Sequence, residues 1–428
     1  MRRPIPSSVL LLGTALLSSG CFDQAVAPSF ETDGRIEITN DEGSLAGRTD
    51  YMTTPVPIDA PTGVPAMVSG PAGAPPALAP KDIDLTLIAE FESPIVSGHR
   101  VQATSIWQTS DQKIIVSYNM QGPLALGGLD YFTKLLNKNP VLRSSVVFTD
   151  ADVNSVFLNG RFAYAATSSS DPSFAFPAVL ERIRVKSDRF QVDPDNRRIA
   201  LSSFAATASE STDHEVYAVS GDGGHVFAFD EDDMTLRGQY ALDDARWVAW
   251  DKDDDRVVVL QGTPGRLSIF RENSFPGGSM ELLNTVSVPG VDVPESKATV
   301  EIVGDKAFVA AGPSGVQIVC LDNGQVVGSI PRPDPASLGL SSSVVVTNAV
   351  TVQKDLIFIS NGEAGVYAAA ASVDLEKSSC TQSFTVSVLG RLRFADLQSV
   401  NHVSYRDDHL FIAAGLGGVK VVEVDVTK

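Results

Sequence analysis

The feature that most constrains this chain is a short motif that returns about every 50 residues. In its clearest form an apolar stretch leads into Gly-x-x-Gly and a second apolar stretch follows, as at Ala307–Val319 and Leu410–Val422. Close copies begin at Leu356 and Val216, and a weaker one begins at Val257. Glycine allows the positive φ or the close backbone approach that a tight hairpin requires. Each copy therefore predicts two antiparallel strands joined by a tight turn.

The spacing of the copies predicts the architecture. The turns start at Gly221, Gly262, Gly312, Gly362 and Gly415, which gives steps of 41, 50, 50 and 53 residues. Two degenerate copies precede them, at Ile114–Phe132 and Phe162–Ile183. Seven units with four short strands each and little helical periodicity predict an all-β fold, a seven-bladed β-propeller of four-stranded antiparallel blades. A β-sandwich is the alternative, but it would not need seven near-copies of one hairpin.

The two ends of the repeat predict how the ring closes. The chain ends on the third strand of the last unit, Val419–Val424, with no room for a fourth. Leu85–Phe91 reads as a strand with no blade of its own. Pairing the two would complete the seventh blade with an N-terminal strand and remove an exposed sheet edge. We therefore expect residues 84–428 to form one propeller domain.

The repeat resembles a known one. Ala-Phe-Val-Ala-Ala-Gly-x-x-Gly-Val-x-Ile-Val, at Ala307–Val319, is similar to the LVIVD repeat of secreted and surface bacterial proteins, and Asp322 and Asp425 fit its usual continuation. The copy at Tyr367–Ala371 departs from it with a run of alanines. The resemblance implies a propeller and a surface setting. It implies no chemistry, because that family has no shared catalytic residues.

The N-terminus has the pattern of an export signal. Two arginines at positions 2 and 3 precede a short apolar stretch, Val9–Leu17, and small residues lead to Cys21. These features predict a secretory signal over residues 1–20, since the apolar stretch is too short to span a bilayer. Leu17–Cys21 resembles a bacterial lipobox, which implies lipidation of Cys21, although Ser18 stands where an aliphatic residue is usual. A plain signal peptide is the alternative.

By the same resemblance, Phe22 after the cysteine, in place of aspartate, implies a lipid anchor in the outer membrane. Residues 21–83 are expected to be a disordered tether rich in Pro, Ala and Gly. Between Tyr51 and Pro80 there are eight prolines, three glycines and a single charged residue, Asp59. Such a composition buries too little apolar surface to offset the entropy of ordering it.

Charge narrows the partners. Loss of residues 1–20 removes two of 33 basic residues and none of 52 acidic ones, which leaves a net charge of −21. This charge opposes binding to nucleic acid or to an anionic membrane surface, so membrane contact is expected through the lipid alone. It suits an envelope or extracellular protein partner with a basic patch. Of the remaining cysteines, Cys320 and Cys380 form either a disulfide, which export would permit, or two separate thiols.

No motif carries catalysis, a cofactor or a metal, so we predict no catalytic, cofactor-binding or metal residues. Asp251–Asp255 resembles the start of a Ca²⁺ loop, but Arg256 replaces the glycine such a loop needs, and a solvated turn is the preferred interpretation. His402 is expected near the channel. Its convergence there with His99, Arg246 and Asn401 would favour an enzyme.

The best predicted binding surface is the face where the blade-to-blade loops and the Gly-x-x-Gly turns emerge, because loops on a rigid scaffold concentrate binding residues. Its acidic residues are Asp150, Asp152, Asp243, Asp244, Asp292, Glu295, Asp334 and Asp396. We expect this face to bind a basic protein patch or a divalent cation, and loops that are acidic only because the whole chain is acidic are the alternative.

Together these features predict a cell-envelope lipoprotein that acts as a protein-binding or scaffolding propeller rather than as an enzyme. An extracellular hydrolase or lyase with its site at the central channel mouth is one alternative. A structural subunit of an envelope complex is another. The fold alone cannot decide among them, because propellers host unrelated functions.

Overall fold

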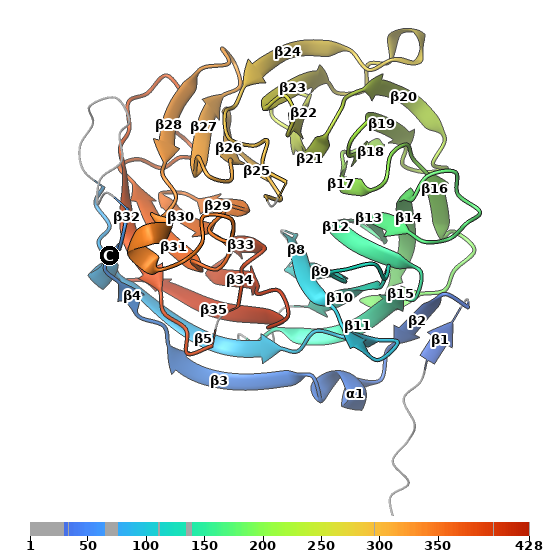
Figure 1. Cartoon of the computed structure of the whole chain (residues 1–428), viewed down its shortest axis with the longest axis horizontal. Helices are drawn as coiled ribbons and strands as arrows, with labels where there is room; N and C mark the ends of the chain where they lie inside the picture. The colour runs from blue at the N-terminus through green and yellow to red at the C-terminus, as the bar shows by residue number, and fades with distance from the viewer. Residues whose placement is uncertain are drawn as a thin grey trace, which may run out of the picture.

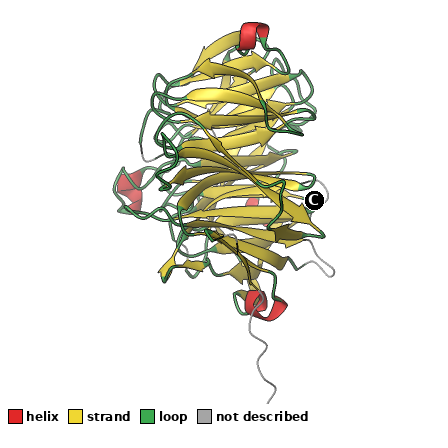
Figure 2. Ribbon diagram, turned by 90° about the vertical axis from the view of Figure 1, so that its right-hand side faces the viewer, coloured by secondary structure: helices red, strands yellow, loops and turns green. Residues whose placement is uncertain are grey.

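Seven small antiparallel sheets stand around a central axis, as Figure 1 shows. The computed structural model describes residues 30–32, 34–64, 76–109, 112–133, 139–294, 296–396 and 398–427. Seen from the side, the strands cross the thickness of the ring and the loops gather at its two faces (Figure 2). The predicted seven-bladed β-propeller is confirmed.

In most blades four strands follow one another from the inside of the ring to its rim. Blade 1 has β8(Gln102–Gln108), β9(Lys113–Asn119), β10(Gly127–Thr133) and β11(Val141–Phe148). Blade 2 has β12(Ala151–Asn159), β13(Phe162–Ser169) and β14(Ala178–Lys186), with β15(Arg189–Gln191) and β16(Arg197–Ala200) both paired to β14. Blade 3 has β17(Ala206–Ser211), β18(Glu215–Ser220), β19(His225–Asp230) and β20(Leu236–Ala241). Blade 4 has β21(Ala245–Asp251), β22(Arg256–Gln261), β23(Arg266–Arg271) and β24(Leu282–Ser287).

The last three blades contain the clearest copies of the repeat. Blade 5 has β25(Val300–Val303), β26(Lys306–Ala310), β27(Val316–Cys320) and β28(Val326–Ile330). Blade 6 has β29(Ala349–Gln353), β30(Leu356–Ser360), β31(Val366–Ala371) and β32(Val386–Leu392). Blade 7 has β33(His402–Arg406), β34(His409–Ala413), β35(Val419–Val426) and, at its outer side, β5(Ile83–Phe91). The short helices are α1(Glu42–Ala46) and α2(Pro335–Leu338), with 3-10 turns at Pro80–Asp82 and Pro276–Gly278. None of the helices in the described ranges is long and apolar enough to cross a membrane.

The repeated motif forms the second and third strands of each blade, as predicted. In blade 5 the turn between β26 and β27 holds Gly312 at φ 50° and Gly315 at φ 72°. A Cβ atom at Gly315 would lie 2.1 Å from the carbonyl oxygen of Ile330 on the outermost strand. The second glycine is therefore required both by its left-handed backbone and by the close approach of the next segment.

Blade 7 closes the ring with strands from both ends of the chain. β5 pairs antiparallel with β35, in a register that sets Phe91 opposite Val419 and Ile83 opposite Val426. This is the closure predicted from the unpaired strand at Leu85–Phe91. It removes a free edge on the last blade, which would otherwise offer a template for pairing with another chain.

The prediction of a disordered tether is wrong for residues 34–64, here called the N-terminal segment. β2(Ile36–Thr39) pairs with β11, β3(Thr49–Pro55) with β5, and β4(Ile58–Asp59) with β32. The segment thus adds a strand to the outer edges of blades 1, 7 and 6, along the blue rim of Figure 1. The composition of the segment predicted disorder because the segment cannot form a core of its own. The outer strands of the blades supply the backbone hydrogen-bond partners and the apolar surface that it lacks. Residues 65–75 and Cys21 lie outside the described residues.

One ion pair fastens the N-terminal segment to blade 1. Arg48 extends from the turn after α1 to the fully buried carboxylate of Asp130 on β10, which also accepts a hydrogen bond from the Tyr118 hydroxyl at 2.7 Å. Arg48 also donates to the carbonyl of Glu92, next to the closing strand. The Asp130 carboxylate raises the pKa of Arg48 against the opposing effect of burial. A buried charge left without its partner is strongly destabilising, so this contact holds the segment in place.

Candidate functional site

The two loop types do share one face, here called the glycine-turn face. Isolated bridges join Gly312 to Thr347, Gly362 to Val400 and Gly415 to Ala103, so the glycine turns of blades 5, 6 and 7 touch the start of the innermost strand in the next blade. The blade-to-blade loops end at the same place. The opposite face, which carries the hairpins after the innermost strands, is here called the hairpin face.

Most acidic residues predicted on the glycine-turn face have partners inside the protein. Asp150 pairs with Arg198 at 2.8 Å and lies 3.7 Å from Arg35. Asp152 accepts hydrogen bonds from the backbone N–H groups of Met120, at 2.8 Å, and Leu126, at 3.3 Å, in the loop between β9 and β10. Burial raises the pKa of Asp152 to about 6.

Three further residues of this face hold loops together. Asp243 accepts a hydrogen bond from the backbone of Gly223, and Asp244 binds the guanidinium of Arg246 through two contacts of 3.0 and 2.9 Å. Asp334 caps α2. Asp292 and Asp396 are exposed, and Glu295 lies outside the described residues. A binding role for this face stays a prediction, carried mainly by Asp292 and Asp396.

The four residues whose convergence would favour an enzyme do not meet at one end of the channel. His99 lies exposed in β7(His99–Arg100), which pairs only with β6(Ile95–Val96). Arg246 faces the glycine-turn side, where it lines a hollow of about 490 Å³. Asn401 donates to the carbonyl of Ala103 at 2.8 Å, and His402 lines a different cavity toward the hairpin face.

The acidic run Asp251–Asp255 forms the turn between β21 and β22. Arg256, at the position where a Ca²⁺ loop needs glycine, donates to Asp251 at 2.8 Å and to Asp254 at 2.6 Å. These two carboxylates therefore neutralise an arginine of the same turn.

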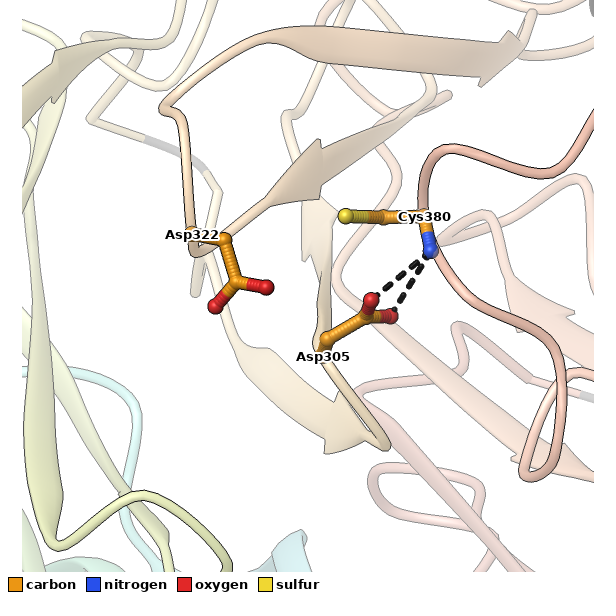
Figure 3. A group of neighbouring side chains, drawn as sticks. All are labelled: Asp305, Asp322 and Cys380. Atoms are coloured by element: carbon orange, nitrogen blue, oxygen red, sulfur yellow. Dashed lines mark hydrogen bonds between the residues drawn. The ribbon is translucent and has the colours of Figure 1, made fainter.

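Another acidic group lies beside a disulfide. The ligand atoms of Asp305, Asp322 and Cys380 lie within 4.8 Å of one another. Figure 3 shows these three side chains, with the carboxylate of Asp305 turned toward the backbone nitrogen of Cys380. However, Cys380 is bonded to Cys320, with Cα atoms 5.4 Å apart. Asp305 accepts hydrogen bonds from the Cys380 N–H at 3.0 and 2.8 Å and pairs with Lys306. A disulfide sulfur is not the thiolate that metals bind, so the group stabilises the contact between blades 5 and 6. This pairing resolves the alternative left open by the sequence.

A ring of side chains forms the neck of the channel on the glycine-turn side. One residue per blade occupies the same place at the start of the innermost strand. These residues are Thr104, Asn154, Thr207, Arg246, Lys297, Asn348 and Asn401. Six of the seven donate to a backbone carbonyl of the next blade, always the one just before the equivalent residue, at 2.7–3.4 Å. This repeated hydrogen bond ties neighbouring blades together around the axis.

Lys297 is the exception. Its ammonium crosses the channel and donates to the carbonyls of Thr104 and Asn154 at 2.8 Å each, both three blades away, in opposite directions around the ring. The hydroxyl of Ser296 donates instead to the carbonyl of Thr347 in the next blade. Burial lowers the pKa of Lys297 to about 7, because the charged form loses its hydration in the channel. Lys297 thus narrows the neck with a group whose charge depends on pH.

Beyond the neck lies a cavity of about 340 Å³, here called the channel cavity, lined by the second halves of the innermost strands. The chain has three tryptophans, Trp107, Trp247 and Trp250, and all of them line it. Trp247 stacks on the ring of His402, with centroids 5.7 Å apart, and also lines the hollow on the other side of the neck. The channel cavity therefore combines large aromatic surfaces with polar groups, as small-molecule and peptide pockets do.

The buried Glu210 and His402 and the partly buried Glu301 line the channel cavity. Glu210 is 6% exposed, and burial raises its pKa well above the usual range. Burial also raises the pKa of Glu301 to about 7, against hydrogen bonds from Val352 N–H and Thr351. Burial, aided by the charge of Lys297, lowers the pKa of His402 to about 3, so the imidazole is neutral. Perturbed ionisable groups gathered in one cavity mark a candidate functional site.

Sequence reasoning placed His402 near the channel but missed Glu210, Glu301 and Lys297. The motif that revealed the blades covers the second and third strands, whereas these side chains lie on the innermost strands. Aligning the seven innermost strands would have shown Lys297 as the one lysine in a series otherwise made of Thr, Asn and Arg.

No family model matches the chain, and no curated protein matches it. Among solved structures, the computationally designed protein Ika8 aligns at 11% identity and a TM-score of 0.42 over 78% of this chain and 99% of that one. PorZ, a bacterial surface component of the type-IX secretion system of Porphyromonas gingivalis, aligns at 14% identity and a TM-score of 0.45. That alignment covers 77% of this chain, which spans only 37% of the PorZ chain.

Proposed function

We propose that this protein is an exported, lipid-anchored binding propeller that receives its ligand in the channel cavity. The observation that carries the proposal is the shape of the channel. The neck ring and Lys297 narrow one end, and all three tryptophans line the space on the other side. A tapering aromatic cavity can bury one end of a ligand and hold it by packing and by a few oriented polar groups.

The export signal and the lipobox-like sequence before Cys21 support the anchored location. Within the described residues, no serine, threonine or cysteine hydrogen bonds to His402, so the channel cavity lacks the nucleophile and base pair of common hydrolases. The net charge and the expected surface setting favour another envelope or extracellular protein as the source of the ligand.

Site-specific photo-cross-linking tests the binding proposal. A photoreactive amino acid at Gln353, which lines the channel cavity, should cross-link one defined partner in intact cells. The same group at Glu363, exposed in a glycine turn of the same blade, is the matched control. Equal cross-linking from both positions, or none from Gln353, would refute a binding site in the channel cavity. Incorporation of an alkyne-labelled fatty acid, lost in Cys21→Ser, tests the anchor separately.

A hydrolase or lyase is the second candidate, because Glu210, Glu301 and His402 line one cavity with perturbed ionisation. Paired carboxyl groups with raised pKa values suit general acid catalysis. Turnover of a polysaccharide or lactone library by the wild type, abolished in both Glu210→Gln and Glu301→Gln, would establish this activity. Equal turnover in the variants would remove it.

A further inference from the structure

We propose that the ligand of the channel cavity carries an organic cation, an ammonium or guanidinium group, which binds between the tryptophan rings and the carboxyl groups of Glu210 and Glu301. This inference rests on the proposed function and names the chemistry of its ligand. Three independent features of the channel cavity lead to it.

The first feature is that neither the buried Glu210 nor the partly buried Glu301 forms an ion pair. Among the described residues, Glu210 accepts a hydrogen bond from the N–H of the adjacent Ser211 at 3.3 Å. Glu301 accepts hydrogen bonds from the N–H of Val352 at 3.2 Å and from Thr351, and Arg406 acts on it electrostatically without a contact. Neither residue has an ion-pair partner among the described side chains. Three other buried carboxylates are neutralised, since Asp130 meets Arg48, Glu181 meets two arginines and Asp251 meets Arg256. Glu215, outside the channel cavity, is also buried without an ion pair among the described residues. Burying a carboxyl group without a partner is costly, so these two are suited to meet a charge brought by a ligand.

The second feature is the aromatic lining. The face of an indole ring attracts cations, and the attraction grows when water is excluded. Trp250 already takes part in such a contact, because the ammonium of Lys252 lies 5.0 Å from the centre of its ring, beside a neighbouring hollow that both residues line. Trp107 is held by packing against Phe157, with ring centroids 4.2 Å apart, so its orientation is fixed.

The third feature is an unused hydrogen-bond position. Nδ1 of His402, whose side chain is 8% exposed, has no hydrogen-bond partner in the described part of the chain. Because its lowered pKa keeps the ring neutral, one nitrogen of this imidazole accepts a hydrogen bond. Ammonium and guanidinium groups bring several donors and no acceptor, which suits this position and the two carboxyl groups together.

The other charged residues that line the channel cavity also favour a cationic ligand. Glu376 and Asp407 line the cavity beside Arg406, so carboxyl groups outnumber basic ones among the lining residues. At the neck, Arg246 is paired with Asp244, and the donors of Lys297 are directed to the carbonyls of Thr104 and Asn154.

Intrinsic fluorescence gives a direct readout, because every tryptophan of the chain lines the channel cavity. Full-length protein in detergent is titrated at pH 8 with Nα-acetyl-L-argininamide and with Nα-acetyl-L-citrullinamide, which has nearly the same shape but no charge, because acetylation removes the α-ammonium that the two amides would otherwise share. We expect saturable quenching by the acetylated argininamide and at least about tenfold weaker binding of the acetylated citrullinamide, since charge-assisted hydrogen bonds and cation–π contact are lost. A tripeptide with a central arginine is titrated in the same way. Binding of the tripeptide would indicate that the cation can come from a protein chain, whereas binding of the free amide alone would indicate a small molecule.

Variants assign the effect to residues. Glu210→Gln and Glu301→Gln should each weaken binding of the acetylated argininamide at least fivefold, whereas the exposed control Glu363→Gln should bind like the wild type. The wild-type comparison of the two amides needs no variant and stands even if a buried substitution unfolds the protein.

Equal affinity for both amides overturns the inference, as does failure of both the free amide and the arginine tripeptide to bind. The proposed function would survive either result if cross-linking from Gln353 still captured one partner. It would fail only if that cross-linking failed.

Discussion

Replacing Lys297 with methionine should change how the stability of the protein depends on pH. Burial in the channel lowers the pKa of Lys297 to about 7, whereas an unfolded lysine titrates near 10.4. Between these values the unfolded chain binds more protons than the folded one, so the free energy of unfolding of the wild type must rise with pH. The dependence has this sign because burial destabilises the charged form of Lys297 in the folded protein. That destabilisation disappears as the ammonium of the folded protein loses its proton.

The size of the effect follows from the two pKa values. Integrating proton uptake from pH 7 to pH 9 gives a gain of about 2 kcal/mol for one lysine with these pKa values. Lys297 keeps some surface toward the channel, which weakens the desolvation, so we expect about 1–2 kcal/mol. The carbonyls of Thr104 and Asn154 lose their donor in Lys297→Met, but that cost does not depend on pH and shifts the whole curve.

The measurement is urea unfolding of the wild type and Lys297→Met at half-unit steps from pH 7 to pH 9. The difference in unfolding free energy between the two proteins should shift by 1–2 kcal/mol across this range, in favour of the wild type at high pH. The exposed Lys186→Met is the matched control and should follow the wild type at constant offset. Parallel curves for the wild type and Lys297→Met would refute the reasoning, because they would mean that the channel carbonyls keep the ammonium charged.

Three further predictions concern how the ring is held together. Replacing both Cys320 and Cys380 with serine opens a cross-link between positions 60 residues apart, and should lower the unfolding free energy by about 4 kcal/mol in denaturant titrations. Arg48→Ala leaves the buried carboxylate of Asp130 without its cation, and should cost about 3–5 kcal/mol in the same assay, whereas the double variant that also carries Asp130→Asn should recover part of this loss. Removing residues 30–59 exposes the outer edges of blades 1, 7 and 6, so light scattering should detect self-association that the intact chain does not show. An equally monodisperse truncated protein would mean that these edges need no cover.

The sequence was most informative where one unit determines its own structure. The glycine turns and their flanking apolar stretches predicted the hairpins, and the unpaired stretch at Leu85–Phe91 predicted the closure, because both rest on local geometry and on counting strands. The role of the N-terminal segment was not predictable in this way. Ile36 and Ile38 are fully buried, but only against strands made much later in the chain.

The channel cavity was hidden for a related reason. Its side chains come from six different blades, and none of them belongs to the repeated hairpin. Trp107, Trp247 and Trp250 have no regular spacing along the chain, since two of them lie on one strand and the third lies three blades away around the ring. Only the closed ring brings them to one place, so no local pattern could have indicated a shared site.

The closure of blade 7 has a consequence for how the molecule is made. β5 leaves the ribosome before any complete blade, yet its partner β35 is synthesised only after the other six blades. Until then β5 has only β3 to pair with, and an isolated two-stranded sheet is marginally stable. Before the ring closes, the chain therefore carries an unpaired edge on β5 and, once it is made, a complementary edge on β35. Nothing in the pairing of these two edges distinguishes the chain's own β35 from that of a neighbouring copy. Crowded synthesis should favour dimers in which two chains exchange β5, and dilution before the ring closes should favour the monomer.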